Sequence, residues 1–207
     1  HLLKTEQSVF ERLLKVNADK SMKEDRTTLR EKILDTAIAL FIEKGSENVT
    51  TRELTEALNL SRSHIYHYFS DWQTLCLDAY SRFMLTDLDN FTQTVQAAPP
   101  EQQLRAFITG YLPETTDAIW QLYSALWRKA IREARYAELA LAMTHAWDRL
   151  LSDIIAANVT KDIDVMQVTR QLSALLNGYA DHLMINPTPE ARRQAMNDID
   201  AFLQRSL

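Results

Sequence analysis

Glycine and proline are scarce in this chain, which holds only 3 Gly and 5 Pro among 207 residues. Hairpins and the turns of β-sandwiches consume Gly, so an all-β fold is disfavoured. The three Gly are isolated from one another, which excludes a Gly-rich phosphate-binding loop. The sequence therefore predicts an all-α fold built from long helices.

Cysteine content, hydropathy and net charge limit the kinds of site and partner that the chain can have. A single cysteine, Cys76, leaves no intrachain disulfide and no Cys-based zinc site, and we expect neither a metal nor a cofactor. No apolar run approaches 18 residues and no leader with a small-residue cleavage site opens the chain, so we expect a cytoplasmic protein without membrane contact. The net charge of −5 argues against nucleic-acid binding. Residues 20–82, however, hold 9 Lys+Arg and 10 Asp+Glu, so most of the acidic excess lies elsewhere.

Apolar residues recur at helical spacing along almost the whole chain. From residue 27 to 44 they follow the i, i+4, i+8, i+11 pattern of a buried helix face. The pair Pro99-Pro100 is the clearest break. Nine to ten helices are expected in total, with the best-defined ones at about 27–44, 51–58, 62–68, 72–97, 101–111, 114–134, 136–158, 163–185 and 189–206.

Residues 1–26 are interpreted as an N-terminal extension. Residues 2–16 carry an amphipathic stripe that predicts a further helix. The chain begins with His1, and Met22 is an alternative natural start, so part of the extension need not be native.

Residues 49–69 carry the strongest functional signal, two short helices joined by a tight turn at Asn59. Thr50 with Glu53 forms a capping-box pattern at the first helix. Apolar residues of the two helices are expected to pack together: Leu54, Ala57 and Leu58 against Ile65 and Phe69. The second helix then exposes donors, acceptors and flat rings: Arg62, Ser63, His64, Tyr66, His67 and Tyr68. Such a face suits phosphates and base edges in a major groove, although the alternative is an ordinary solvated helix face.

This segment resembles the DNA-binding domain of the TetR family of transcriptional regulators. The resemblance covers residues 27–80 in detail and the rest in outline. It rests on a Thr-rich helix start at 50–51, the turn 57–61, the ending 66–69 and a hydrophobic first helix that ends at Phe41 and Gly45. It implies a DNA-binding domain over residues 27–80 and a ligand-binding and dimerisation domain over residues 81–207.

Two positions depart from the family pattern. Asn59 stands where Gly is usual, which suits a left-handed turn. Trp72 stands where a Lys usually contacts a phosphate, and an indole cannot supply that charge. The indole N–H, the backbone N–H groups and the helix dipole remain available to a phosphate there.

The resemblance also implies roles for single residues. Thr51 is expected to meet a phosphate, and Arg52 a guanine or a phosphate. Base readers at the start of the second helix would be Arg62, Ser63 and His64. Backbone contacts would come from Tyr66, His67 and Tyr68, with His67 also near a base.

The last two predicted helices each carry a long apolar stripe. Two such helices from each subunit would form a four-helix dimer interface. The expected interface residues are Val168, Leu172, Leu175, Tyr179, Ala195, Ile199 and Phe202. The alternative is that both stripes face only their own core.

Aromatic residues gather in the second half, where Trp120, Tyr123 and Trp127 share one helix face. Such a stripe is often plain core, but it also lines ligand cavities in helical bundles. The candidate pocket residues are Phe107, Tyr111, Trp120, Tyr123, Trp127, His145, Trp147 and Tyr179.

The C-terminal half resembles the branch of the family that includes choline-responsive repressors of betaine synthesis. This second resemblance rests on the Trp-x6-Trp spacing and on residues 175–178. It implies an aromatic or cationic effector, with a carboxylate from Glu133, Asp148 or Asp181 nearby.

Taken together, these features predict a ligand-responsive repressor. A homodimer would bind a palindromic, double-stranded operator through the helix at 62–68, and a small molecule in the C-terminal domain would release it. The helix from residue 72 to 97 would act as the lever. No nucleophile elbow, metal triad or phosphate loop favours an enzyme, and the remaining alternative is a helical protein–protein adaptor that does not bind DNA.

Overall fold

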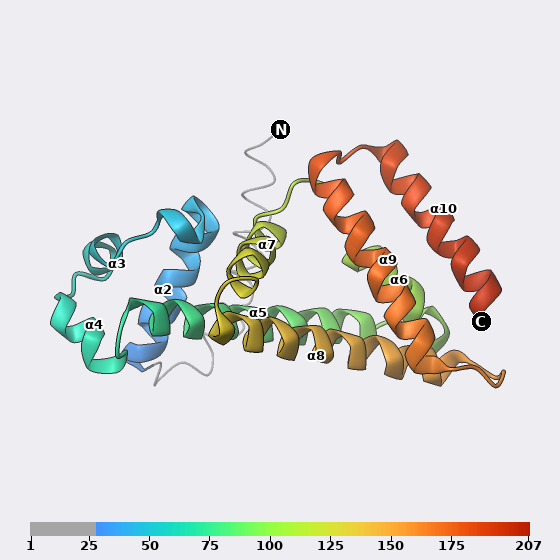
Figure 1. The fold of residues 1–207 in the computed structure, drawn as a ribbon, viewed down its shortest axis with the longest axis horizontal. Helices are drawn as coiled ribbons and strands as arrows, with labels where there is room; N and C mark the ends of the chain where they lie inside the picture. The colour runs from blue at the N-terminus through green and yellow to red at the C-terminus, as the bar shows by residue number, and fades with distance from the viewer. Residues whose placement is uncertain (1–27) are drawn as a thin grey trace.

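The computed structural model describes residues 28–207, and the helix predicted at residues 2–16 lies outside this range. Within the described residues the chain forms nine α-helices and two short 3₁₀ helices and contains no strand (Figure 1). The elements are α2 (Leu29–Lys44), η1 (Ser46–Asn48), α3 (Thr51–Leu58), α4 (Arg62–Tyr68), α5 (Trp72–Gln96), η2 (Pro100–Gln102), α6 (Gln103–Tyr111), α7 (Ala118–Ala130), α8 (Ala134–Asn158), α9 (Val165–Ile185) and α10 (Pro189–Ser206). The all-α prediction is confirmed.

Side-chain caps set many of the helix starts. Thr50 accepts a hydrogen bond from the Glu53 amide while the Glu53 carboxylate accepts one from the Thr50 amide, so the predicted capping box is confirmed. Asp117 caps α7 by accepting from the amide of Ile119. This cap starts α7 four residues later than the sequence predicts, because residues 112–117, which include Pro113, form a loop.

Helices α2, α3 and α4 pack as a small unit at one end of the molecule (Figure 1). Leu54 of α3 and Ile65 of α4 have no exposed surface. Asn59, at the end of α3, has φ 53° and ψ 42°, the left-handed conformation that the turn requires. Ala57 is exposed, so the expected close contact of the two helices at Ala57 is wrong.

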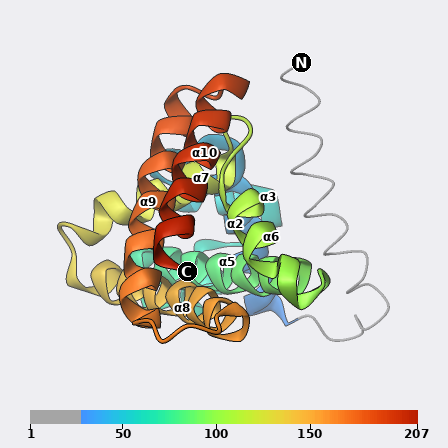
Figure 2. The ribbon, with the colours of Figure 1, turned by 90° about the vertical axis from the view of Figure 1, so that its right-hand side faces the viewer.

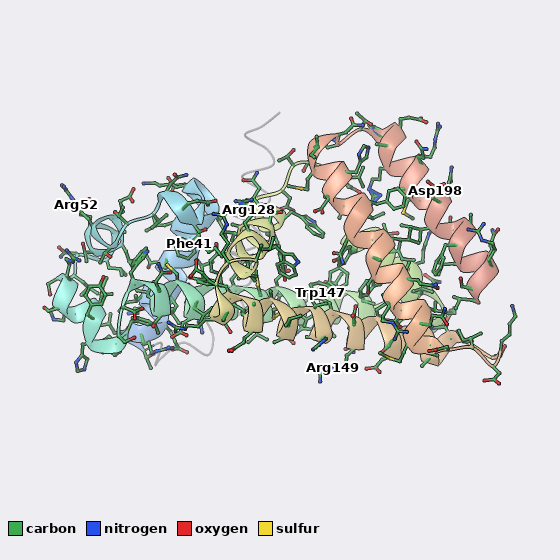
Figure 3. The ribbon with its side chains drawn as sticks, viewed as in Figure 1. Phe41, Arg52, Arg128, Trp147, Arg149 and Asp198 are labelled. Carbon is green, nitrogen blue, oxygen red and sulfur yellow. The ribbon has the colours of Figure 1, made fainter. Side chains whose placement is uncertain are left out.

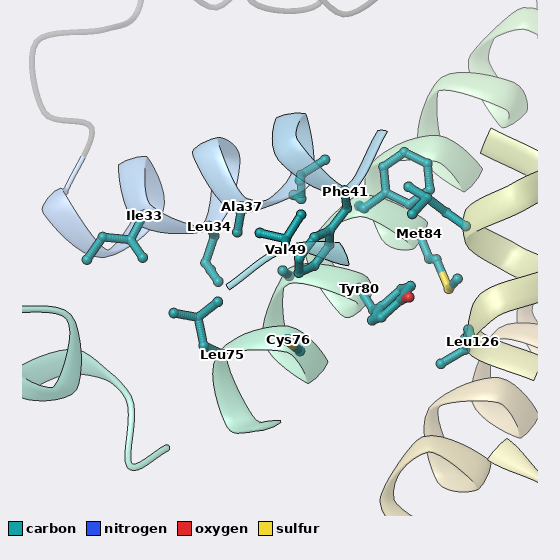
Figure 4. Packing of buried hydrophobic residues seen from close by; sticks show 14 of the residues in the cluster. Ile33, Leu34, Ala37, Phe41, Val49, Leu75, Cys76, Tyr80, Met84 and Leu126 are labelled. Atoms are coloured by element: carbon teal, nitrogen blue, oxygen red, sulfur yellow. The ribbon is translucent and has the colours of Figure 1, made fainter. Parts of the chain in front are cut away.

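The first hydrophobic core runs from this unit into the rest of the chain. The ring of Phe41 on α2 lies 5.8 Å from that of Tyr80 on α5, with Leu126 of α7 on the far side (Figure 4). Helix α5 therefore belongs to both halves of the protein, and no linker separates them.

The second core lies among α6, α8, α9 and α10. Trp147 on α8 packs against both cores. Helices α9 and α10 stand side by side (Figure 2), at the end of the molecule far from α4 (Figure 1). None of the described helices is long and apolar enough to cross a membrane.

Candidate nucleic-acid interface and effector site

Helix α4 is held by its buried side and presents the opposite side to solvent. Ile65 and the following Phe69 are buried in the first core. Five of the six predicted contact residues are exposed, and Tyr66 is half-buried: Arg62, Ser63, His64, Tyr66, His67 and Tyr68. The structure thus brings the predicted DNA-contacting residues of α4 together on one accessible surface.

Local hydrogen bonds order this surface. Ser61 caps α4 and accepts from the amide of His64. Its hydroxyl also lies 2.7 Å from Nδ1 of His64 and 2.8 Å from the hydroxyl of Ser63. The hydroxyls of Thr51 and Tyr66 are 3.1 Å apart, which joins α3 to α4. The start of α4 is therefore preorganised.

Most cations near this surface are already paired with a carboxylate. Arg52 donates to Glu56, one turn along α3, with 2.8 Å between Nε and Oε1 (Figure 3). Arg62 is in no ion pair among the described residues, and its guanidinium lies 5.9 Å from the centre of the Tyr66 ring. Further pairs in this half include Arg30–Asp78, Lys44–Glu53 and Arg82–Asp35. Arg62 is thus the cation on α4 available to DNA.

Trp72 begins α5 directly after α4. Its side chain is half-buried and packs against the first core. The adjacent Asp71 accepts from the Thr74 amide at 2.6 Å, and this hydrogen bond lowers the pKa of the Asp71 carboxyl. A carboxylate at this helix start opposes an approaching phosphate, so phosphate contact at Trp72 stays a prediction.

Glu56→Gln is expected to strengthen operator binding and to steepen its salt dependence. The change removes an anion beside the DNA surface and frees Arg52 for a phosphate. One extra phosphate contact increases the slope of log K against log salt by about one. The slope is measured by fluorescence anisotropy between low and physiological salt. An unchanged slope would show that Arg52 does not face the backbone.

Five of the eight predicted pocket residues pack together: Phe107, Tyr111, Trp120, Tyr123 and Trp147. The ring of Tyr111 lies 5.3 Å from Trp120 and 5.6 Å from Trp147, and it stacks on Phe107 at 5.8 Å. Tyr123 lies 6.2 Å from Trp120. We call this group the aromatic cluster: Phe91, Phe107, Tyr111, Trp120, Tyr123 and Trp147. Phe91, which comes from α5, is a member that was not predicted from the sequence.

Three predicted pocket residues lie outside the aromatic cluster. Trp127 is 41% exposed and touches only its edge, 6.1 Å from Tyr123. His145 is exposed on α8. Tyr179 lies between α9 and α10, where its hydroxyl donates to Asp198 at 2.6 Å.

One carboxylate contacts the aromatic cluster, and the charges of two others act on it. The hydroxyl of Tyr123 donates to Asp87 of α5 at 3.0 Å. Burial raises the pKa of Tyr111, and the charges of Asp148, Asp181 and Asp87 raise it further. Burial also raises the pKa of Tyr123, with Asp87 the next cause. The site therefore combines aromatic faces with negative charge, the combination that binds organic cations.

Of the three carboxylates expected at this site, Asp148 and Asp181 act on Tyr111, as stated above. Glu133 instead precedes α8 and contributes to the raised pKa of Tyr136 in the first core. Asp87 was missed, because it is 36 residues from Tyr123 in sequence and only the fold brings the two side chains together.

The predicted dimer surface needs a correction at its buried members. Leu172, Ala195 and Ile199 are 0% exposed, and Val168 is 7% exposed. They fill the core between α9, α10 and the rest of the subunit, so a partner does not reach them. Half-buried members of the prediction remain on the surface: Leu175, Tyr179 and Phe202.

An open cleft of about 530 Å³ lies between α9 and α10. Leu175, Tyr179, His182 and Asp198 are among the residues that line it. Gly178 also lines the cleft. A Cβ at this position would meet nothing within 4 Å, so no neighbouring helix of the same subunit requires a glycine there.

Two family models match the chain. The model of bacterial regulatory proteins of the tetR family matches residues 33–78, and the model of the BetI-type transcriptional repressor C-terminal region matches residues 100–207. The second match alone covers more than half of the chain.

Curated relatives agree with these matches. The HTH-type transcriptional regulator BetI of Burkholderia ambifaria is 26% identical over 160 residues, which cover 74% of this chain and 80% of that protein. The HTH-type regulator YfiR of Bacillus subtilis is 29% identical over 100 residues, which cover 48% of this chain and only 47% of that protein.

Solved structures share the fold. A transcriptional regulator from Saccharomonospora viridis, crystallised in complex with choline, superposes with a TM-score of 0.70 at 19% identity, covering 84% of this chain and 95% of that one. A TetR transcription regulator from Haloarcula marismortui superposes with a TM-score of 0.71 at 16% identity, covering 86% and 97%. With the matching family models, these findings place the chain in the TetR family of transcriptional regulators, with a C-terminal half of the BetI type.

Proposed function

We propose that this regulator is a repressor whose homodimer binds a palindromic operator and releases it when a small quaternary ammonium compound binds at the aromatic cluster. The observation that carries the proposal is the aromatic cluster itself, since its rings and the carboxylates around them suit an organic cation. Membership of the family supplies the DNA-binding half of the proposal and argues against an enzyme.

Operator binding is assigned to α4. Helices of this kind insert their N-terminal residues into the major groove, which favours Arg62, Ser63 and His64 as base readers. A two-fold dimer would place two copies of α4 on half-sites separated by about one turn of DNA, roughly 34 Å. A palindromic operator follows from that symmetry.

The dimer is assigned to the outer surface of α9 and α10. Leu175, Tyr179 and Phe202 keep exposed area there, and the open cleft of about 530 Å³ can receive side chains of a partner helix. Four helices, two from each subunit, would then bury this surface.

The effector is assigned to the class that includes choline. A quaternary ammonium group is attracted by aromatic faces and by carboxylates, and it needs no hydrogen-bond donor from the protein. The relative from Saccharomonospora viridis holds choline, which supports the same class here. Because the rings pack against one another, a ligand must part them, and Asp87 and Phe91 lie on α5, which leads directly to α4. A ligand that binds the parted rings more tightly than the packed rings favours the parted arrangement, and through α5 it shifts the position of α4.

A gel shift with the DNA upstream of the protein's own coding region tests operator binding. We expect a specific complex at salt below ~100 mM, with two subunits per site and a footprint that is symmetric. Absence of any shift would contradict the assignment and favour the adaptor alternative.

Asp87→Asn is expected to weaken choline binding roughly tenfold or more, because the change removes a negative charge at the aromatic cluster while preserving side-chain shape. Binding is measured by tryptophan fluorescence, which reports on Trp120 and Trp147. The matched control is Asp89→Asn on the same helix, where an exposed carboxylate accepts a hydrogen bond from Gln93 at 3.0 Å. Equal choline affinity in the wild type and in Asp87→Asn would contradict a cation site beside Asp87.

A further inference from the structure

Helix α10 holds the end of α6 through one arginine. Nη2 of Arg192 donates to the carbonyl of Thr109 at 2.8 Å and reaches the carbonyl of Leu112 at 3.5 Å. The last carbonyls of a helix have no intrahelical partner, and a cation at that end is favoured by the helix dipole. Arg192 therefore fixes the point where α6 stops and the loop to α7 begins.

The end of α6 is also one wall of the aromatic cluster. Tyr111 is the last residue of α6, and Phe107 lies one turn before it. An ion pair between Arg105 and Asp200, at 2.5 Å, joins the first turn of α6 to α10. The hydroxyl of Tyr111 donates to Asn177 of α9 at 2.7 Å. Arg192 thus holds the carbonyls of Thr109 and Leu112 on either side of Tyr111, while Asn177 of α9 accepts from the Tyr111 hydroxyl.

An arginine at position 192 is expected to stabilise the fold less than an apolar side chain would. Its side chain is only 19% exposed, and Nε is buried without a hydrogen-bond partner among the described residues. The carboxylate of Glu114 is 3.7 Å away and largely exposed. Burying an unsatisfied donor carries a free-energy penalty that an apolar side chain of similar length would avoid. The two carbonyl contacts, which an apolar side chain would lose, are what the arginine adds.

We infer that Arg192 is a positioning residue of the effector site: by holding the carbonyl end of α6, it keeps Tyr111 in the aromatic cluster. The inference rests on the proposed function only for the identity of the ligand. The positioning itself is a property of the free protein and is testable without any ligand.

Hydrogen exchange of the free protein is the first test. In Arg192→Met we expect the amides of Tyr111 and Leu112 to exchange at least tenfold faster, while amides in the middle of α8 keep their rate. Arg192→Lys, which keeps one cationic donor, should recover part of the protection. Arg193→Met is the matched control, because Arg193 is exposed and pairs with Glu190 of its own helix. Unchanged exchange at Tyr111 and Leu112 in Arg192→Met would overturn the inference.

Titration with choline chloride is the second test. We expect Arg192→Met to weaken choline binding about fivefold or more and Arg193→Met to leave it unchanged. The double variant Arg192→Met with Tyr111→Phe should lose no more choline affinity than the weaker-binding single variant, since both changes act on the same side chain. A lower melting temperature of Arg192→Met with unchanged choline affinity would show a structural role only and overturn the inference. If the wild type binds no choline, the proposed effector fails, and the exchange experiment still decides the role of Arg192.

Discussion

Arg62→Ala weakens operator binding by about 10- to 100-fold, the expected cost of losing one guanidinium that contacts a base edge or a phosphate. Arg62 is the first residue of α4, the position from which recognition helices reach base edges. Its guanidinium is in no ion pair within the described part of the chain, whereas Arg30, Lys44, Arg52 and Arg82 are each paired.

The measurement is fluorescence anisotropy with labelled DNA from upstream of the coding region, at one fixed salt concentration. Arg149→Ala is the control, because it removes the same charge from an exposed site on α8, far from α4 (Figure 3). We expect Arg149→Ala to bind like the wild type. An equal loss in both variants would indicate a diffuse electrostatic effect, and no loss in Arg62→Ala would contradict the role of α4.

Phe41→Ala lowers the free energy of unfolding by about 3–5 kcal/mol, the usual cost of truncating a buried phenylalanine. Phe41 is 2% exposed and packs on Tyr80 (Figure 4), whose hydroxyl in turn hydrogen-bonds to Ser46. This contact joins α2 and η1 to α5, so the cavity would loosen the DNA-binding helices from the rest of the protein.

The melting temperature should fall by roughly 6 to 20 °C in a chain of this size. Leu85→Ala serves as the control, because Leu85 is 55% exposed and its truncation should change stability by less than about 0.5 kcal/mol. Chemical denaturation followed by circular dichroism measures both variants. Equal stability of Phe41→Ala and Leu85→Ala would show that the first core does not hold the two halves together.

Local features of the sequence predicted local features of the structure well. The capping box at Thr50 and Glu53, the left-handed Asn59 and the buried Ile65 each depend on residues within one or two turns. The exposed face of α4 follows directly from them, because anchoring one side of a short helix leaves the other side free. Such interactions are encoded at short range, where propensity and periodicity are informative.

Long-range choices were harder to predict. An apolar stripe buries equally well against its own subunit or against a partner, and for this reason the predicted interface included Leu172, Ala195 and Ile199, which lie in the core. Asp87 contacts Tyr123 of the aromatic cluster only because the fold brings distant parts of the chain together. No periodicity within α5 distinguishes Asp87 from the exposed Asp89 two residues later.

Net charge gave a misleading indication about DNA. The chain is acidic overall, and even residues 20–82 are slightly acidic. Carboxylates pair with Arg30, Lys44, Arg52 and Arg82, whereas Arg62 at the start of α4 is in no ion pair among the described residues. Contacts with phosphates and bases depend on where the charged side chains lie, and not on the net charge of the domain.

The most direct test of the account follows the operator complex during a titration with choline chloride. The complex is preformed with labelled operator DNA and monitored by anisotropy at constant ionic strength, with sodium chloride as the matched salt. We predict that choline raises the apparent Kd for the operator at least tenfold in the wild type and has a much smaller effect in Asp87→Asn. Operator affinity that stays constant across the choline titration, in a wild type that binds choline, would contradict the claim that the aromatic cluster controls α4.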